Sequence, residues 1–134
     1  MYHFNSVVLL TLAAVVAGCT TSGMVASGKP GGDAEFAKHL VIHNEALAND
    51  VIIQDMNTRM TGGLLEVNVV LANLTATDKK IQYRFSWYDE SNFEVESGAD
   101  TWTPLLLHGF AQKSMQALAP SPKVTTYKVN VREL

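Results

Sequence analysis

Hydrophobic and polar residues alternate with a period of two along much of the chain after about residue 35. The clearest example is residues 81–88 (IQYRFSWY), and residues 65–71 (LEVNVVL) and 125–131 (TTYKVNV) repeat it. Successive side chains point to opposite faces of a β-strand, so this pattern predicts three strands that each bury one face. We expect Trp87, on the buried side of its strand, to pack between two sheets.

Shorter segments predict further strands. Residues 51–56 (VIIQDM) and 40–43 (LVIH) are rich in aliphatic side chains, and residues 93–97 (FEVES) return after a polar turn at 89–92 (DESN). Aliphatic runs bounded by turn residues are typical of short strands. Six or seven short strands in about 100 residues predict an all-β fold, an immunoglobulin-like antiparallel β-sandwich over residues 35–134.

Two segments fit no simple period. Residues 109–118 (GFAQKSMQAL) agree with a helical turn as well as with a strand, and we predict an irregular-to-strand segment. Residues 102–107 (WTPLLL) are apolar but contain a proline, which is disfavoured inside a sheet. We therefore predict that 102–107 form a connection that caps the sandwich.

The first 34 residues have a different composition. Residues 1–18 carry no Lys, Arg, Asp or Glu, and residues 7–17 (VVLLTLAAVVA) form an apolar run that is too short to span a bilayer as a helix. This pattern predicts a helical signal peptide over residues 1–18. Residues 19–34 are rich in Gly, Ser and Thr and predict a flexible tether with an r.m.s. reach of about 20–23 Å.

The signal peptide ends in a motif of small residues before a cysteine. Val16-Ala17-Gly18-Cys19 resembles the lipobox of bacterial lipoproteins. The resemblance implies that Cys19 becomes the acylated first residue of the mature protein and attaches it to the membrane. Because Thr20 stands where an aspartate resembles an inner-membrane retention signal, we expect the periplasmic face of the outer membrane. Several acyl chains on one residue would make the anchor stable.

Composition and spacing argue against most kinds of catalytic or cofactor site. Ten Lys and Arg against thirteen Asp and Glu give a net charge of −3, so no nucleic-acid partner is expected, and one cysteine excludes an intramolecular disulfide. His39 and His43 would lie about 13 Å apart on a strand, too far to share a metal ion. We expect no catalytic residue, no metal and no cofactor, and therefore a non-enzymatic domain.

A cluster of acidic residues leaves one enzymatic alternative. Asp89, Glu90, Glu94 and Glu96 surround the predicted turn. A hydrolase can use a pair of carboxylates, but a solvated hairpin end has the same composition. A hydrolase is the least favoured interpretation.

Exposed apolar residues indicate a protein-contact surface. Tyr88 follows Trp87 and faces the opposite side of its strand, and 102–107 place more apolar residues in a predicted connection. Aromatic and apolar side chains on a surface are typical of interfaces. The predicted surface consists of Tyr88, Phe93, Trp102, Leu105 and Leu106.

Several motifs occur in the order found in one family of lipoproteins. After the lipobox come residues 83–89 (YRFSWYD), Trp102 with Pro104, 117–120 (ALAP) and 127–129 (YKV). Together they resemble the YcfL-like family of small periplasmic lipoproteins. The resemblance implies a compact β-sandwich without an established activity.

The expected function is an interaction or accessory role in the bacterial cell envelope. The lipid anchor, the short tether and the absence of a reactive motif favour a partner protein of unknown identity in the envelope. The alternative is a carrier or sensor that holds a small envelope ligand in a pocket between the sheets.

The lipobox generates the first testable prediction. A palmitate analogue fed to cells should label the wild-type chain and should not label Cys19→Ala, because the substitution removes the thiol that is acylated. In-gel detection after immunoprecipitation measures the label. An unlabelled wild-type chain, or a labelled variant, would contradict the prediction.

Overall fold

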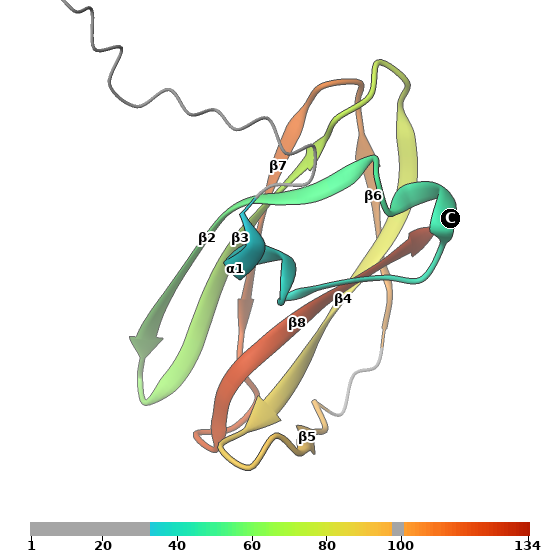
Figure 1. Ribbon diagram of the computed structural model, residues 1–134. Coiled ribbons are helices and arrows are strands. Elements are labelled where there is room, and N and C mark those ends of the chain that lie inside the picture. The colour runs from blue at the N-terminus through green and yellow to red at the C-terminus, as the bar shows by residue number, and fades with distance from the viewer. Residues whose placement is uncertain (1–32, 98–100) are drawn as a thin grey trace, which may run out of the picture.

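Strands form where the period-two pattern predicts them. The computed structural model describes residues 33–97 and 101–134, and Figure 1 shows these residues as two sheets that pack face to face. The elements are α1 (Ala34–Ala37), β1 (Leu40–Ile42), η1 (Glu45–Leu47), β2 (Val51–Thr61), β3 (Leu64–Asn73), β4 (Lys79–Asp89), β5 (Glu94–Val95), β6 (Thr103–Leu107), β7 (Gln112–Leu118) and β8 (Val124–Glu133). The prediction of an all-β sandwich is confirmed. The signal peptide, Cys19 and the tether up to residue 32 lie outside the described residues.

Sheet B, as we name the smaller sheet, has the strand order β2-β3-β7. Strands β2 and β3 form a long antiparallel hairpin whose turn is Gly62-Gly63. Both glycines have positive φ values, 58° and 79°, which a two-residue hairpin turn requires. β7 then pairs antiparallel with β3 and places Met115 opposite Val69 on the inner face of the sheet.

Sheet A, the larger sheet, is built around β4. One side of β4 pairs antiparallel with β8, and the other side pairs first with β6 and then with β5. The remaining strand, β1, runs parallel to β8, so the expectation of a wholly antiparallel sandwich is wrong for this one short strand. A parallel neighbour of β8 is possible because the long path through β2 to β7 separates the two strands in the sequence.

The prediction for residues 102–107 is corrected by the structure. Thr103–Leu107 form strand β6 and not a connection, and Pro104 lies opposite Gln82 of β4. Among the described residues β6 pairs with β4 alone, so it is an edge strand, and edge strands tolerate a residue without an N–H. The proline rule excluded a central strand but did not exclude this edge strand.

The ambiguous segment 109–118 divides at its middle. Phe110 has a φ of 55° within the turn, and Gln112–Leu118 form β7. The irregular-to-strand prediction therefore describes this segment well. The return strand predicted at 93–97 exists as β5, which is only two residues long.

The hydrophobic core lies between the two sheets and comes from the inward positions of every long strand. Trp87 is 4% exposed and packs there, as the sequence predicts. On β4, the rings of Phe85 and Trp87 stack with centroids 5.7 Å apart, and Tyr127 of β8 completes the aromatic group. Phe36 of α1 packs against the edge of this core, and α1 lies against β2. Burial of such side chains is the main source of stability in the absence of a disulfide.

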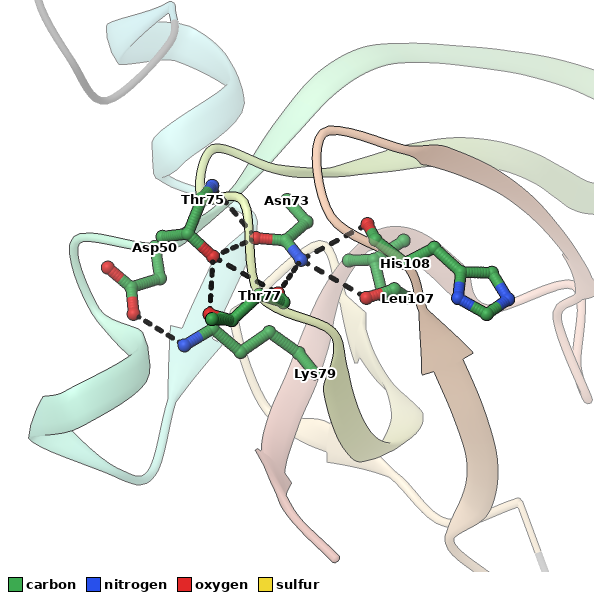
Figure 2. Close-up of polar contacts among 7 residues, drawn as sticks. All are labelled: Asp50, Asn73, Thr75, Thr77, Lys79, Leu107 and His108. Carbon is green, nitrogen blue, oxygen red and sulfur yellow. Dashed lines mark hydrogen bonds and ion pairs between the residues drawn. The ribbon is translucent and has the colours of Figure 1, made fainter.

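A buried asparagine joins the two sheets (Figure 2). Asn73, at the end of β3, is 2% exposed, and its Nδ2 donates to the carbonyl oxygens of Thr77, Leu107 and His108 at 2.8, 3.1 and 3.1 Å. Its Oδ1 accepts hydrogen bonds from the backbone N–H and the hydroxyl of Thr75. Two of the four chain crossings between the sheets, β3 to β4 and β6 to β7, are thus held by one side chain.

Further contacts next to Asn73 hold the β3–β4 loop and the turn after β6 in position. Lys79 forms an ion pair with Asp50 at 3.0 Å (Figure 2). Gly109 lies so close to the backbone of Ala76 that a Cβ at this position would clash with it. The N–H of Gly109 donates to Asp78, and this bond together with His108 lowers the pKa of the Asp78 carboxyl. The stabilisation by Asp78 is therefore present above the unfolded-state pKa of the carboxyl and is lost as the pH falls through the folded-state value.

The Asn73 contacts generate a stability prediction. Asn73→Ala should lower the free energy of unfolding by about 2–4 kcal/mol, because three carbonyl groups and Thr75 each lose a hydrogen bond to a side chain that is itself buried. Urea denaturation followed by circular dichroism measures the loss. Asn68→Ala, on the outer face of sheet B with a single hydrogen bond to Ser114, is the matched control and should cost less than about 1 kcal/mol. Equal losses in the two variants would contradict the role given to Asn73.

Candidate surface for protein contacts

The outer face of sheet A carries cationic and aromatic side chains. Because Ile81, Tyr83, Phe85 and Trp87 face the core, the alternate residues of β4 face outward, and the strand register continues this face across β8 and β6. The outward residues of these three strands are Lys80, Gln82, Arg84, Ser86, Tyr88, Thr126, Lys128, Asn130, Arg132, Pro104 and Leu106. Trp102, immediately before β6, joins them through its ring contacts.

Trp102 is the centre of this face. The guanidinium carbons of Arg132 and Arg84 lie over its ring, 4.0 and 4.7 Å from the ring centroid. His43, just after β1, meets the same ring edge-on at 5.5 Å. Arg132 is itself oriented, because its Nε donates to the side-chain oxygen of Gln82 at 2.9 Å. Side chains from three strand regions, those of β4, β8 and β1, therefore converge on the indole ring of Trp102.

The contacts of Trp102 hold two positive charges close together. The two guanidinium groups are separated by no more than the sum of their distances to the ring, and at such distances like charges repel by about 0.5 kcal/mol in water. Each cation–π contact contributes about 0.5–1 kcal/mol at an exposed site, which offsets that repulsion. The Trp102 ring thus compensates for the repulsion between Arg84 and Arg132, which can therefore lie close together.

A second cation–aromatic pair lies further along β4. The ammonium group of Lys128 lies 5.2 Å from the ring centroid of Tyr88. Between the two pairs, Asn130 donates to the hydroxyl of Ser86 at 2.7 Å and contacts His43 Nε2 at 3.2 Å. Polar groups with defined orientations therefore separate the two aromatic contacts.

The five residues predicted as a contact surface do not share one place. Tyr88, Trp102 and Leu106 lie on the outer face of sheet A, and Leu106 is 42% exposed. Leu105 has the opposite orientation on β6 and packs against the core. Phe93 is 71% exposed but lies in the turn between β4 and β5.

The histidines have structural contacts. His39 stacks on Tyr127 with ring centroids 4.5 Å apart, and its Nδ1 contacts the Tyr127 carbonyl oxygen at 2.7 Å. His43 belongs to the Trp102 contacts, and His108 lies 3.3 Å from Asp78. In residues 33–97 and 101–134, no group of three or more His, Cys, Asp or Glu is arranged to hold a metal ion.

The acidic turn has a conformational role for one of its carboxylates. Asp89 accepts hydrogen bonds at 2.9 Å from the N–H groups of Ser91 and Phe93. This arrangement supports the turn at Asn92, whose φ of 65° is in the left-handed region that asparagine tolerates.

The part of the sandwich that the structure describes has hollows on its surface. The one beside β5 has a volume of about 420 Å³ and is lined by Phe85, Ser86, Trp87, Glu94, Val95, Glu96 and Ser97. A second of about 190 Å³ lies on sheet B, and a third of about 440 Å³ lies near the C-terminus.

Sequence reasoning overlooked the cations of the candidate surface. Arg84, Lys128 and Arg132 occupy the polar positions of the two strands with the clearest alternation. Their positions in the pattern place them on one face of each strand. The missing information was that β4 and β8 are neighbours, which the sequence pattern does not specify.

A family model matches residues 38–133, which is most of the chain and all of the long strands. The model describes proteins of unknown function under the designation DUF1425. The chain belongs to the DUF1425 family. Among curated proteins, none matches this chain.

Two crystal structures resemble the fold. A DUF1425 family member from Shewanella sp. pv-4 is 30% identical with a TM-score of 0.57, over 63% of this chain and 78% of that one. Campylobacter jejuni cj0090 has a TM-score of 0.56 at 14% identity, over 72% of this chain and 98% of that one. At 14% identity the second likeness concerns the fold alone.

None of the helices within the described ranges is both long and apolar enough to cross a bilayer.

The environments of the two tryptophans generate a spectroscopic prediction. Trp102→Phe leaves Trp87, which is almost fully buried, and its fluorescence should be blue-shifted and poorly quenched by acrylamide. Trp87→Phe leaves Trp102, which should be quenched more strongly, and adding Arg132→Gln should increase the quenching further because Arg132 covers the ring. Quenching titrations on folded samples measure both effects. Equal quenching of the two tryptophans would contradict the assigned positions.

Proposed function

We propose that this DUF1425 protein is a lipid-anchored envelope protein of the YcfL-like kind, whose β-sandwich contacts another protein through the outer face of sheet A. The observation that carries the proposal is the packing of Trp102 with Arg84 and Arg132 on an outward-facing sheet. Tryptophan, tyrosine and arginine are the residues most enriched at the energetic centres of protein interfaces. Because these side chains are already ordered before a partner binds, the entropic cost of binding is lower.

The apolar edge of the same face supports this assignment. Pro104 and Leu106 continue from Trp102 along β6, and both are exposed. An apolar strip beside polar and charged groups is the usual composition of a non-obligate interface. The surface therefore offers apolar contact and hydrogen-bonding groups together.

The proposed anchor adds a reason for weak contacts to be effective. Cys19 with the lipobox before it, followed by a short tether, would keep the sandwich near one membrane leaflet. Confinement of two proteins to the same surface raises their effective concentration. A contact of modest affinity would then suffice in the envelope, at the periplasmic face of the outer membrane.

The hollow beside β5 favours a second candidate function. Its volume of about 420 Å³, with Phe85 and Trp87 in its lining, is within the range of small-molecule sites. A small-ligand carrier or sensor would use it. Native mass spectrometry of the protein purified from cells would reveal a bound mass if this alternative holds.

In-cell crosslinking tests the contact surface. A photoreactive amino acid at Leu106 should give a defined crosslinked product in intact cells, because Leu106 is exposed on the outer face of sheet A. Adding Trp102→Ala should reduce the product about five-fold or more, since truncation at an interface centre costs over about 1 kcal/mol. Quantitative immunoblotting measures the product.

Two matched controls accompany this experiment. The same photoreactive residue at Gln116, on the outer face of sheet B, should give much less product, and Phe110→Ala, which removes another exposed aromatic ring, should leave the Leu106 product unchanged. If Leu106 and Gln116 crosslink equally, or if Trp102→Ala has no effect, the surface assignment is wrong.

A further inference from the structure

Positive charge is concentrated on one face of a chain whose net charge is −3. Four of the ten Lys and Arg residues, Lys80, Arg84, Lys128 and Arg132, occupy outward positions of β4 and β8. We name these four residues the basic stripe. The outward positions of β4 from 80 to 88 and of β8 from 126 to 132 include no acidic residue.

The strand register spaces the basic stripe evenly. Arg132 lies opposite Gln82, and Lys128 lies opposite Ser86. Along the direction of β4 there is therefore one cation level with each of residues 80, 82, 84 and 86. In that order the cations are Lys80, Arg132, Arg84 and Lys128, which belong alternately to β4 and β8. Levels two residues apart are about 6.5–7 Å apart along the strands, so the stripe extends over about 20 Å.

This spacing is the period of an extended polypeptide. Alternate side chains of an extended chain point to one side and repeat every two residues, again about 6.5–7 Å. Carboxylates at alternate positions of such a chain would each meet one cation of the basic stripe. Arginine and carboxylate groups also form paired, charge-assisted hydrogen bonds, which adds geometric selectivity.

Three of the four cations of the basic stripe form no ion pair within residues 33–97 and 101–134. The ion pairs formed within the described residues use Lys38, Arg59, Lys79 and His108, and none of them uses Lys80, Lys128 or Arg132. Lys128 and Arg132 have aromatic contacts in place of acidic ones. A carboxylate can approach a cation that rests on an aromatic ring without first displacing another acid.

We propose that the basic stripe binds an extended segment of a partner protein that carries acidic side chains at alternate residues. This inference deepens the proposed function and rests on it, because the stripe shares its face with Trp102, Pro104 and Leu106. Apolar side chains of the same segment would lie against these three residues.

A protein segment fits the stripe better than a membrane surface does. Arg132 is fixed by Gln82 and Trp102, and Lys128 lies over Tyr88, so the charges have defined positions. Attraction to anionic lipid headgroups depends on the number of basic residues near the surface and needs no particular spacing. Regular spacing and oriented side chains gain affinity only against a partner with a matching repeat.

A pair of synthetic peptides tests the repeat. The full chain in nanodiscs of phosphatidylcholine is titrated with a labelled peptide of alternating glutamate and threonine, and with a peptide of the same composition whose glutamates form one block. Fluorescence anisotropy measures binding. The alternating peptide should bind more tightly, and its affinity should fall as salt is raised. Equal affinity of the two peptides, or no binding, would overturn the proposal.

Charge-matched variants locate the site. Lys128→Gln and Arg132→Gln should each weaken binding about two- to five-fold, the range for an exposed ion pair. Lys113→Gln and Lys123→Gln remove the same charge away from the stripe and should leave the affinity unchanged. Circular dichroism melts verify that all four variants are folded. Equal weakening by both pairs of variants would overturn the assignment.

A further experiment tests whether anionic lipid, and not an acidic peptide, is the partner of the basic stripe. In nanodiscs containing phosphatidylglycerol, without peptide, the NMR resonances of Lys128 and Arg132 should keep their positions. If they shift there and the alternating peptide does not bind, the stripe is a membrane contact. If the peptides fail while Leu106 still crosslinks in cells, the proposed function remains and only the acidic segment is wrong.

Discussion

The hydrogen bonds of Asn73 hold two of the connections between the sheets in their relative positions. One buried amide satisfies carbonyl oxygens from the β3–β4 loop and from the end of β6, at the place where the chain crosses between sheets. Buried carbonyl groups need hydrogen-bond donors, and the amide provides one to each of these three. The carbonyls of Leu107 and His108 fix the end of β6, and the register of β6 on β4 in turn sets the position of Trp102.

Strand β4 serves two purposes because its faces differ. Inward, Phe85 and Trp87 stack with Tyr127 in a core that stabilises the sandwich without a disulfide. Outward, the same strand supplies Arg84 and Tyr88 to the candidate surface. β4 is held in place on both sides, because it pairs with β6 and β5 on one side and with β8 on the other. A change in its register by one residue would exchange the two faces and lose both.

One fold can be shared by sequences as different as this chain and Campylobacter jejuni cj0090. A sandwich needs apolar residues at inward positions, and many apolar residues of similar size satisfy that need. Outward positions are not constrained by the core, so a contact surface can differ between proteins of one fold. Any account of function for this protein therefore depends on its own outward residues, above all those around Trp102.

The local features of the protein can be predicted from the order of its residues. Alternation predicted the long strands and the burial of Trp87, because the period of two is a property of each strand alone. The same alternation places Arg84, Arg132 and Tyr88 on the outward faces of their strands. The edge strand β6 was missed because the proline rule is weaker at an edge than in the interior of a sheet.

The choice of neighbouring strands becomes known from the three-dimensional fold alone. Pairing of β4 with β8 and β6 involves residues far apart in the chain, and the parallel position of β1 follows from packing. That pairing brought Trp102 to Arg132 and set Leu105 against the core while Leu106 faced outward. Strand periodicity fixes the face of each residue, but long-range burial and hydrogen bonding choose the neighbours that turn single residues into a surface.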